Sequence, residues 1–142
     1  MAITDPKGLP KMEYVRFGNT GLRDEEESLE VIGKEAYAGI NFFDTADAYS
    51  NGESERVLGK AIQMFNMPRS RIVVATKVFY TIAGVVEIDV LGRQLDGESE
   101  YVNSFGFSRK HIFDACSASL ERSGLDYIDL YQIHRFDHVS IS

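Results

Sequence analysis

The sequence predicts an α/β fold built around parallel strands. Helical and strand patterns alternate along the chain, and three apolar runs each end at or just before a polar residue, namely Asp44, Lys77 and His134. Such alternation requires parallel strands joined by right-handed crossovers. An open doubly wound sheet and part of a (β/α)8 barrel both satisfy this order. No Gly-x-Gly-x-x-Gly follows any strand, which disfavours a dinucleotide-binding doubly wound sheet.

The first part of the chain divides into an arm and the start of the ordered domain. Residues 1–23 are rich in Gly and Pro and are expected to form an irregular arm, whereas 24–142 form the partial barrel domain. A first helix is predicted to begin at Asp24, a capping residue, and to end at Gly39. The strand from Ile40 to Phe43 follows directly. The apolar residues at helical spacing are Leu29, Ile32, Ala36 and Tyr37.

The middle of the chain repeats this helix-to-strand pattern. A second helix is predicted from Glu53 to Phe65, with Glu53 and Glu55 as favourable charges at its N-terminus. The next strand, Arg71 to Thr76, is continuously apolar from Ile72, as expected of a strand covered on both faces. The long connection over residues 78–107 carries several aromatic side chains and is a candidate binding loop.

A third helix and a last strand complete the pattern. The helix is predicted over Arg109 to Ser123, with Ser108 as its N-cap and Gly124 as its stop signal. The strand is predicted from Tyr127 to Ile133 and leads directly into His134.

Composition narrows the function classes. The chain has 142 residues and a net charge of −7, so a nucleic-acid partner and an anionic membrane surface are not expected. No apolar run is long enough to span a bilayer. Cys116 is the single cysteine, which excludes an internal disulfide, fits a cytoplasmic location and makes a Cys/His metal site improbable.

Four polar residues at the three predicted strand ends indicate acid–base chemistry. Asp44, Tyr49, Lys77 and His134 would share one rim, because the carboxyl ends of parallel strands meet at the same edge. An ammonium about 4 Å from a phenol favours the phenolate by about 4 kcal/mol at an effective dielectric of about 20. Lys77 is therefore expected to help Tyr49 release a proton. Asp44 would keep the lysine charged, and His134 would hydrogen-bond a substrate carbonyl.

Each of these residues also has a purely structural interpretation. Asp44 would then be a loop cap, Tyr49 a half-buried aromatic residue, Lys77 a solvated strand end and His134 a hydrogen-bonded core imidazole. For any one residue taken alone the structural interpretation is favoured. The presence of all four at consecutive strand ends favours a proton-donating site suited to carbonyl reduction.

The motifs that carry these residues resemble the aldo-keto reductase family, in its fungal and potassium-channel-β-like branch. The resemblance rests on residues 40–55 (with Asp-Thr-Ala-x-x-Tyr), 58–62, 75–77 and 125–134, and extends over 12–22 and 24–138. It implies a (β/α)8 barrel that reduces an aldehyde or ketone with NADPH. It also implies roles for individual residues: Tyr49 as the proton donor with Lys77 as its partner, Asp44 near the nicotinamide ribose, and His134 orienting the substrate carbonyl.

The chain also departs from the family pattern. Only three barrel strands are recognisable, whereas a complete barrel takes about 250 residues. Arg23 leads directly into the first helix, where family members carry a strand with cofactor contacts. We therefore expect a truncated member that lacks most of the NADPH site, has impaired activity and self-associates through its open sheet edges. A non-catalytic regulatory or binding relative and an inactive gene fragment are the alternatives.

Overall fold

The computed structural model describes residues 25–82 and 103–136. The predicted arm over 1–23, the capping role of Asp24 and most of the predicted binding loop lie outside these ranges. The elements in chain order are the helix α1 (Glu25–Tyr37), the strand β1 (Phe42–Asp44), the 3₁₀ helix η1 (Tyr49–Gly52), the helix α2 (Glu53–Met64), the 3₁₀ helix η2 (Arg69–Arg71), the strand β2 (Val73–Val78), the helix α3 (Arg109–Ser123) and the strand β3 (Leu130–Ile133).

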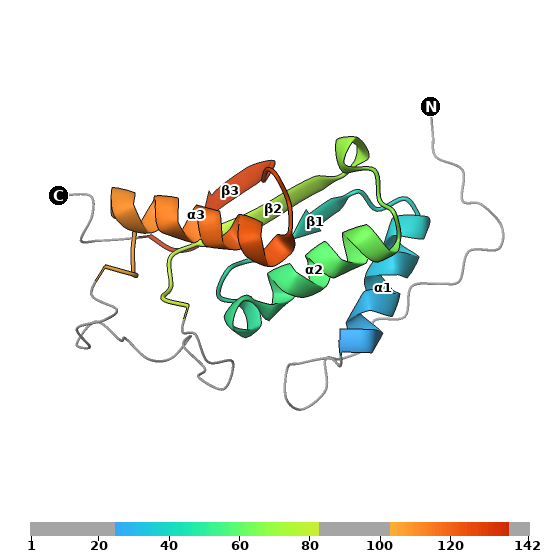
Figure 1. Ribbon diagram of the computed structural model, residues 1–142, viewed down its shortest axis with the longest axis horizontal. Coiled ribbons are helices and arrows are strands. Elements are labelled where there is room, and N and C mark those ends of the chain that lie inside the picture. The colour runs from blue at the N-terminus through green and yellow to red at the C-terminus, as the bar shows by residue number, and fades with distance from the viewer. Residues whose placement is uncertain (1–24, 83–102, 137–142) are drawn as a thin grey trace.

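The three strands form one parallel sheet in the order β1-β2-β3. Figure 1 shows the helices lying along one side of this sheet, with α2 between α1 and α3. The register pairs Phe43 with Val74 and Lys77 with Gln132. The predicted three-stranded parallel α/β arrangement is confirmed.

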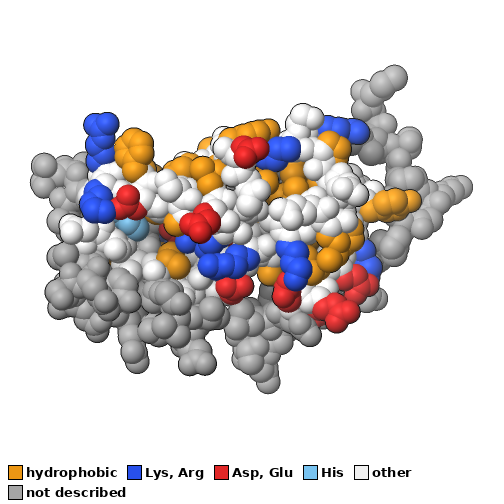
Figure 2. Space-filling model, in the orientation of Figure 1, with side chains coloured by type: hydrophobic (Ala, Val, Ile, Leu, Met, Phe, Trp, Pro, Cys, Tyr) orange, Lys and Arg blue, Asp and Glu red, His pale blue; other side chains and the backbone are white. Residues whose placement is uncertain are grey.

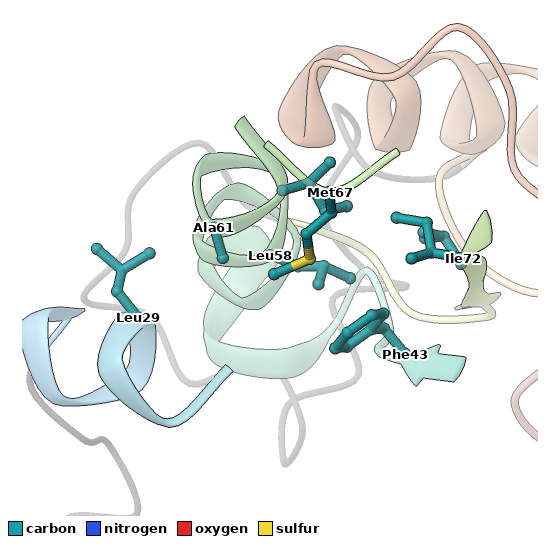
Figure 3. Close-up of a cluster of buried hydrophobic side chains, with 8 residues drawn as sticks. Leu29, Phe43, Leu58, Ala61, Met67 and Ile72 are labelled. Carbon is teal, nitrogen blue, oxygen red and sulfur yellow. The ribbon is translucent and has the colours of Figure 1, made fainter. Parts of the chain in front are cut away.

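The hydrophobic core fills the space between the sheet and the helices α1 and α2. Its buried members include Leu29, Phe43, Leu58, Ala61, Met67 and Ile72 (Figure 3). Phe43 is the one β1 residue that turns toward the helices, and it is buried, while its neighbours Phe42 and Asp44 face the other side of the sheet. Burying an aliphatic or aromatic side chain of this size contributes about 1.5–3 kcal/mol. The core therefore fixes which β1 face carries Asp44.

The strands start later than the sequence predicts. The β2 strand begins at Val73 because the preceding residues 69–71 form η2, closed by a hydrogen bond from the Arg71 amide to the Pro68 carbonyl. The predicted start of the last strand, Tyr127, lies outside β3. Its carbonyl accepts a hydrogen bond from Arg69 at 3.0 Å, which holds it outside the ladder. The predicted end of β1 at Phe43 is one residue short, since Asp44 pairs with Ala75.

Tyr37 does not belong to the buried face of α1. Its side chain is 93% exposed, so its assignment to the apolar face was wrong. Eight residues after Leu29, it is displaced by about 80° around the helix, whereas Ala36 lies within about 20° of Leu29. Ala36 accordingly packs against the core.

The helices α2 and α3 approach each other closely at Gly59. A Cβ atom at this position would lie 2.0 Å from the carbonyl oxygen of Ser123, so only glycine fits. The ends of α3 are those predicted: the Ser108 hydroxyl accepts from the His111 amide at 3.1 Å, and Gly124 adopts a left-handed conformation with φ of 64°. Gly124 therefore ends α3 shortly before β3.

The outer surfaces of the helices carry charges of both signs (Figure 2). Exposed ion pairs join Lys34 to Glu30 in α1, and Lys110 to Asp114 in α3. Such pairs contribute little to stability, and they identify this side of the molecule as solvated. Within the described ranges, no helix is long and apolar enough to cross a membrane.

Candidate active site at the carboxyl ends of the strands

Strand alternation sorts the β2 side chains onto two sides of the sheet. Thr76 turns toward the helices, where its hydroxyl donates to Glu55 at 2.6 Å. The next residue, Lys77, therefore turns to the opposite side. Asp44 and Gln132 share that side, because Asp44 pairs with Ala75 and Gln132 pairs with Lys77.

Lys77 and Asp44 form an ion pair across the neighbouring strands. The lysine Nζ lies 2.5 Å from Asp44 Oδ2 and also donates to the Thr45 carbonyl at 2.8 Å. The side chain of Lys77 is 14% exposed and that of Asp44 is 45% exposed. Two acceptors thus hold the ammonium group at the rim through charge-assisted hydrogen bonds.

Tyr49 is brought next to this ion pair by a short, tightly tied loop. The Asp47 amide donates to the Lys77 carbonyl at 3.2 Å, so the loop after β1 follows the end of β2. Tyr49 then opens η1, and the lysine Nζ lies 5.1 Å from the centre of its ring. The two residues that follow, Ser50 and Asn51, both have positive φ angles, of 49° and 54°. A non-glycine pair in this conformation is strained, as is common near functional sites.

His134 completes the group just beyond the end of β3. Its backbone amide donates to the Val78 carbonyl at 3.1 Å, which ties the backbone of His134 to the end of β2. The imidazole meets the rings of Tyr49 and Tyr80 edge to face, with centroid distances of 5.6 and 5.5 Å. Burial lowers the pKa of His134, and the nearby cation of Lys77 lowers it further. The ring is therefore neutral near pH 7 and is able to donate a hydrogen bond to a carbonyl.

The structure brings together all four residues predicted from the sequence, and it adds two that were missed. Gln132 donates from Nε2 to Asp44 Oδ1 at 2.8 Å. Tyr80 stacks edge-on against His134, and its hydroxyl accepts from Arg135 at 2.9 Å. The period of two in β3 carried a signal for Gln132, since it precedes His134 by two positions and so shares its face.

A second polar cluster lies on the helix side of the sheet. Glu55 was predicted to be a charge at the N-terminus of α2, but it is buried, and it accepts from Thr76 and, at 2.5 Å, from Arg122 Nε. Asp47 is fully buried, and neither of its carboxylate oxygens has a hydrogen-bond partner among the described residues. Burial raises the pKa of Asp47 to about 7, and the negative charge of Glu55 adds to the effect. Burial likewise raises the pKa of Tyr131.

The chemistry of the rim follows from its groups. A phenol, an ammonium and a neutral imidazole lie close together, and a carboxylate balances the ammonium charge. Within the described ranges, no group of three or more His, Cys, Asp or Glu side chains is placed to hold a metal ion. The arrangement is suited to delivering a proton to an oxygen atom.

Comparisons with known proteins identify the family of the chain. The model of the aldo/keto reductase family matches residues 15–140. An aldo-keto reductase of Fusarium vanettenii is 37% identical over 164 aligned positions, which cover 96% of this chain and 44% of that protein. A candidate voltage-gated potassium channel subunit beta of Schizosaccharomyces pombe is 40% identical over 124 positions, covering 87% of this chain and 31% of that protein.

A solved structure supports the same family and fold. The holo form of an aldo-keto reductase from Bacillus halodurans superposes with a TM-score of 0.57 at 31% identity, over 78% of this chain and 31% of that one. The chain thus spans less than half the length of the proteins that it matches. The three parallel strands and their helices are part of a (β/α)8 barrel. Both the sequence match and the fold place this chain in the aldo/keto reductase family.

Proposed function

We propose that this protein is an NADPH-dependent oxidoreductase that interconverts an aldehyde or ketone and the corresponding alcohol, with Tyr49 as the proton donor. The observation that carries the proposal is the convergence of Tyr49, Lys77 and His134 at one rim, with the lysine ammonium 5.1 Å from the tyrosine ring and paired to Asp44. Family membership supports the same class of reaction.

In the proposed reaction the substrate carbonyl oxygen accepts hydrogen bonds from the Tyr49 hydroxyl and from the neutral His134 ring. As a hydride adds to the carbonyl carbon, negative charge develops on the oxygen, and the Tyr49 proton moves to it. The product is the alcohol, and a phenolate is left behind. Lys77 stabilises that phenolate through its positive charge, and Asp44 holds the ammonium in place.

NADPH, when bound, would supply the hydride. The described residues fit the sugar end of such a cofactor at Asp44. Its carboxylate is 45% exposed and keeps acceptor capacity for a ribose hydroxyl beyond its bonds to Lys77 and Gln132.

The test has two parts. The purified chain is titrated with NADPH while the fluorescence of the cofactor is measured. The consumption of NADPH is then measured in the presence of an aromatic or aliphatic aldehyde. We expect saturable binding and aldehyde-dependent oxidation of NADPH. The variant Asp44→Ala should weaken binding, whereas the matched variant Asp126→Ala, changed at an exposed position outside the rim, should not. No binding at millimolar NADPH would exclude the proposal.

A regulatory or binding role is the second candidate, and one observation favours it. The matched protein of Schizosaccharomyces pombe bears the name of a candidate voltage-gated potassium channel subunit beta. A regulatory role requires no proton transfer. It therefore predicts NADPH binding without aldehyde-dependent turnover, which the same experiment distinguishes.

A further inference from the structure

Gln132 makes a contact that the proposed reaction does not yet use. It lies on β3, directly beside Lys77 of β2 in the parallel register. Its side chain passes Lys77 and reaches Asp44 on β1, where Nε2 donates to Oδ1 at 2.8 Å. One hydrogen bond thus connects the two outer strands of the sheet on the side that carries the rim.

Each carboxylate oxygen of Asp44 consequently accepts a hydrogen bond from a different donor. Lys77 takes Oδ2 at 2.5 Å, and Gln132 takes Oδ1. A carboxylate held by a single donor rotates about its last torsion, which is broad for aspartate. With a donor on each oxygen, the plane of the carboxylate is fixed. Gln132 achieves this with a neutral amide, so it adds no charge next to Lys77 or His134.

We propose that Gln132 is a positioning residue for the rim: it orients Asp44 so that the carboxylate holds the Lys77 ammonium beside the Tyr49 ring. The inference rests on the proposed function for its catalytic consequence. Its geometric part, that Gln132 restrains the Asp44–Lys77 pair, is tested without turnover.

The first arm of the test measures the accessibility of the Lys77 amine. Wild-type protein and the variant Gln132→Met, which keeps the length of the side chain but removes the donor, are treated briefly with acetic anhydride. Acetylation of each lysine is then measured by mass spectrometry, with the surface residue Lys60 as the internal reference. We expect acetylation of Lys77 to rise about fivefold relative to Lys60 in the variant. The control Gln63→Met, at an exposed position of α2, should leave the ratio unchanged.

The second arm measures turnover and folding of the same proteins. Because Gln132 is held at the rim and not in the core, Gln132→Met should keep the wild-type melting temperature. Its kcat should fall about tenfold while KM stays the same, the signature of a group needed in the transition state only. If Gln132→Met does not fold, Gln132→Glu serves instead, since it preserves the shape and replaces the donor by an acceptor.

The outcomes separate the two claims. Unchanged acetylation of Lys77 in a folded variant overturns the inference, and so does increased acetylation with unchanged kcat. A wild-type protein that does not consume NADPH overturns the proposed function, and the acetylation ratio still decides whether Gln132 restrains the ion pair.

Discussion

Two ion pairs lie on opposite sides of the same strand, and they have the same distance but differ in the exposure of their carboxylates. On the helix side of β2, Glu55 and Arg122 are paired at 2.5 Å with side chains only 1% and 10% exposed. On the rim side, Asp44 and Lys77 are paired at the same distance of 2.5 Å, with exposures of 45% and 14%. Thr76 donates a hydrogen bond to Glu55 of the buried pair, and the next residue, Lys77, belongs to the rim pair.

The difference shows which pair is structural and which is available for chemistry. The carboxylate of Glu55 accepts hydrogen bonds from Thr76 and Arg122 and has almost no contact with solvent. It therefore joins α2 and α3 to the sheet. The carboxylate of Asp44 remains open to solvent, and its partner Lys77 lies beside the ring of Tyr49. A fully buried pair is costly to break, whereas a pair whose carboxylate is exposed contributes less to stability and can act on a ligand.

Removing the buried carboxylate should have the largest effect on stability. We expect Glu55→Ala to lower the free energy of unfolding by about 3–5 kcal/mol, because it leaves the Arg122 guanidinium buried and unpaired. Urea unfolding followed by circular dichroism measures the change. As a control, Glu53→Ala breaks the exposed pair with Arg56, and we expect a loss of less than about 1 kcal/mol. Equal losses in the two variants would contradict the comparison.

The opposite pattern is expected on the rim. Lys77→Met should reduce turnover about 10²-fold or more, because the phenolate formed on Tyr49 loses its neighbouring cation. The free energy of unfolding should change by no more than about 1 kcal/mol. Parallel assays of NADPH consumption and urea unfolding test this separation. A variant that unfolds as readily as Glu55→Ala would make the rim pair structural as well.

The two sides should also respond differently to pH. Burial raises the pKa of Asp47 to about 7 from an ordinary value of 3.8. The folded state therefore binds more protons than the unfolded state between these values, and this group's contribution to stability is present at low pH and lost as pH rises toward 7. We expect Asp47→Asn to remove this loss, so that its melting temperature exceeds that of the wild type at pH 8 but not at pH 4. Because the two pKa values differ by roughly three, the size is about 4 kcal/mol. An identical pH dependence in the two proteins would contradict the assignment.

The pKa of His134 is shifted in the opposite direction. Burial and the cation of Lys77 lower it, so the ring stays neutral at and above its usual pKa and gains a proton only at lower pH. Turnover should therefore hold steady as pH falls from 7 through the usual histidine range and decline only below it. A pH profile of kcat/KM measures this. A value of kcat/KM that already declines as the pH is lowered toward 7 would contradict it.

The smallest effect concerns association. Within residues 25–82 and 103–136, β1 and β3 each pair on one side only. We propose that these open edges join copies of the chain, since unpaired strand edges are templates for pairing. Size-exclusion chromatography over a range of concentrations should show a shift from monomer toward larger species. A single monomer peak at all concentrations would rule this out.

The sequence predicted which polar residues meet at the rim better than it predicted the bounds of the strands that carry them. Asp44, Lys77 and His134 were identifiable because each interrupts or ends an apolar run, and strand ends meet at one rim in any parallel sheet. The start of β3 was not predictable, because Tyr127 is held outside the ladder by Arg69, a residue 58 positions earlier in the chain. The burial of Glu55 was missed for a related reason. Its partner Arg122 lies 67 positions away, and nothing local distinguishes a buried helix-terminal glutamate from an exposed one.

The central claim is that the Tyr49 hydroxyl donates the proton, and a matched pair of tyrosine variants tests it most directly. Tyr49→Phe removes the hydroxyl on the rim, and Tyr131→Phe removes one on the helix side, where it is buried without a hydrogen-bond partner among the described residues. With NADPH and an aldehyde, we expect kcat to fall about 10²-fold or more in Tyr49→Phe and to remain at the wild-type value in Tyr131→Phe. Wild-type turnover in Tyr49→Phe would contradict the account.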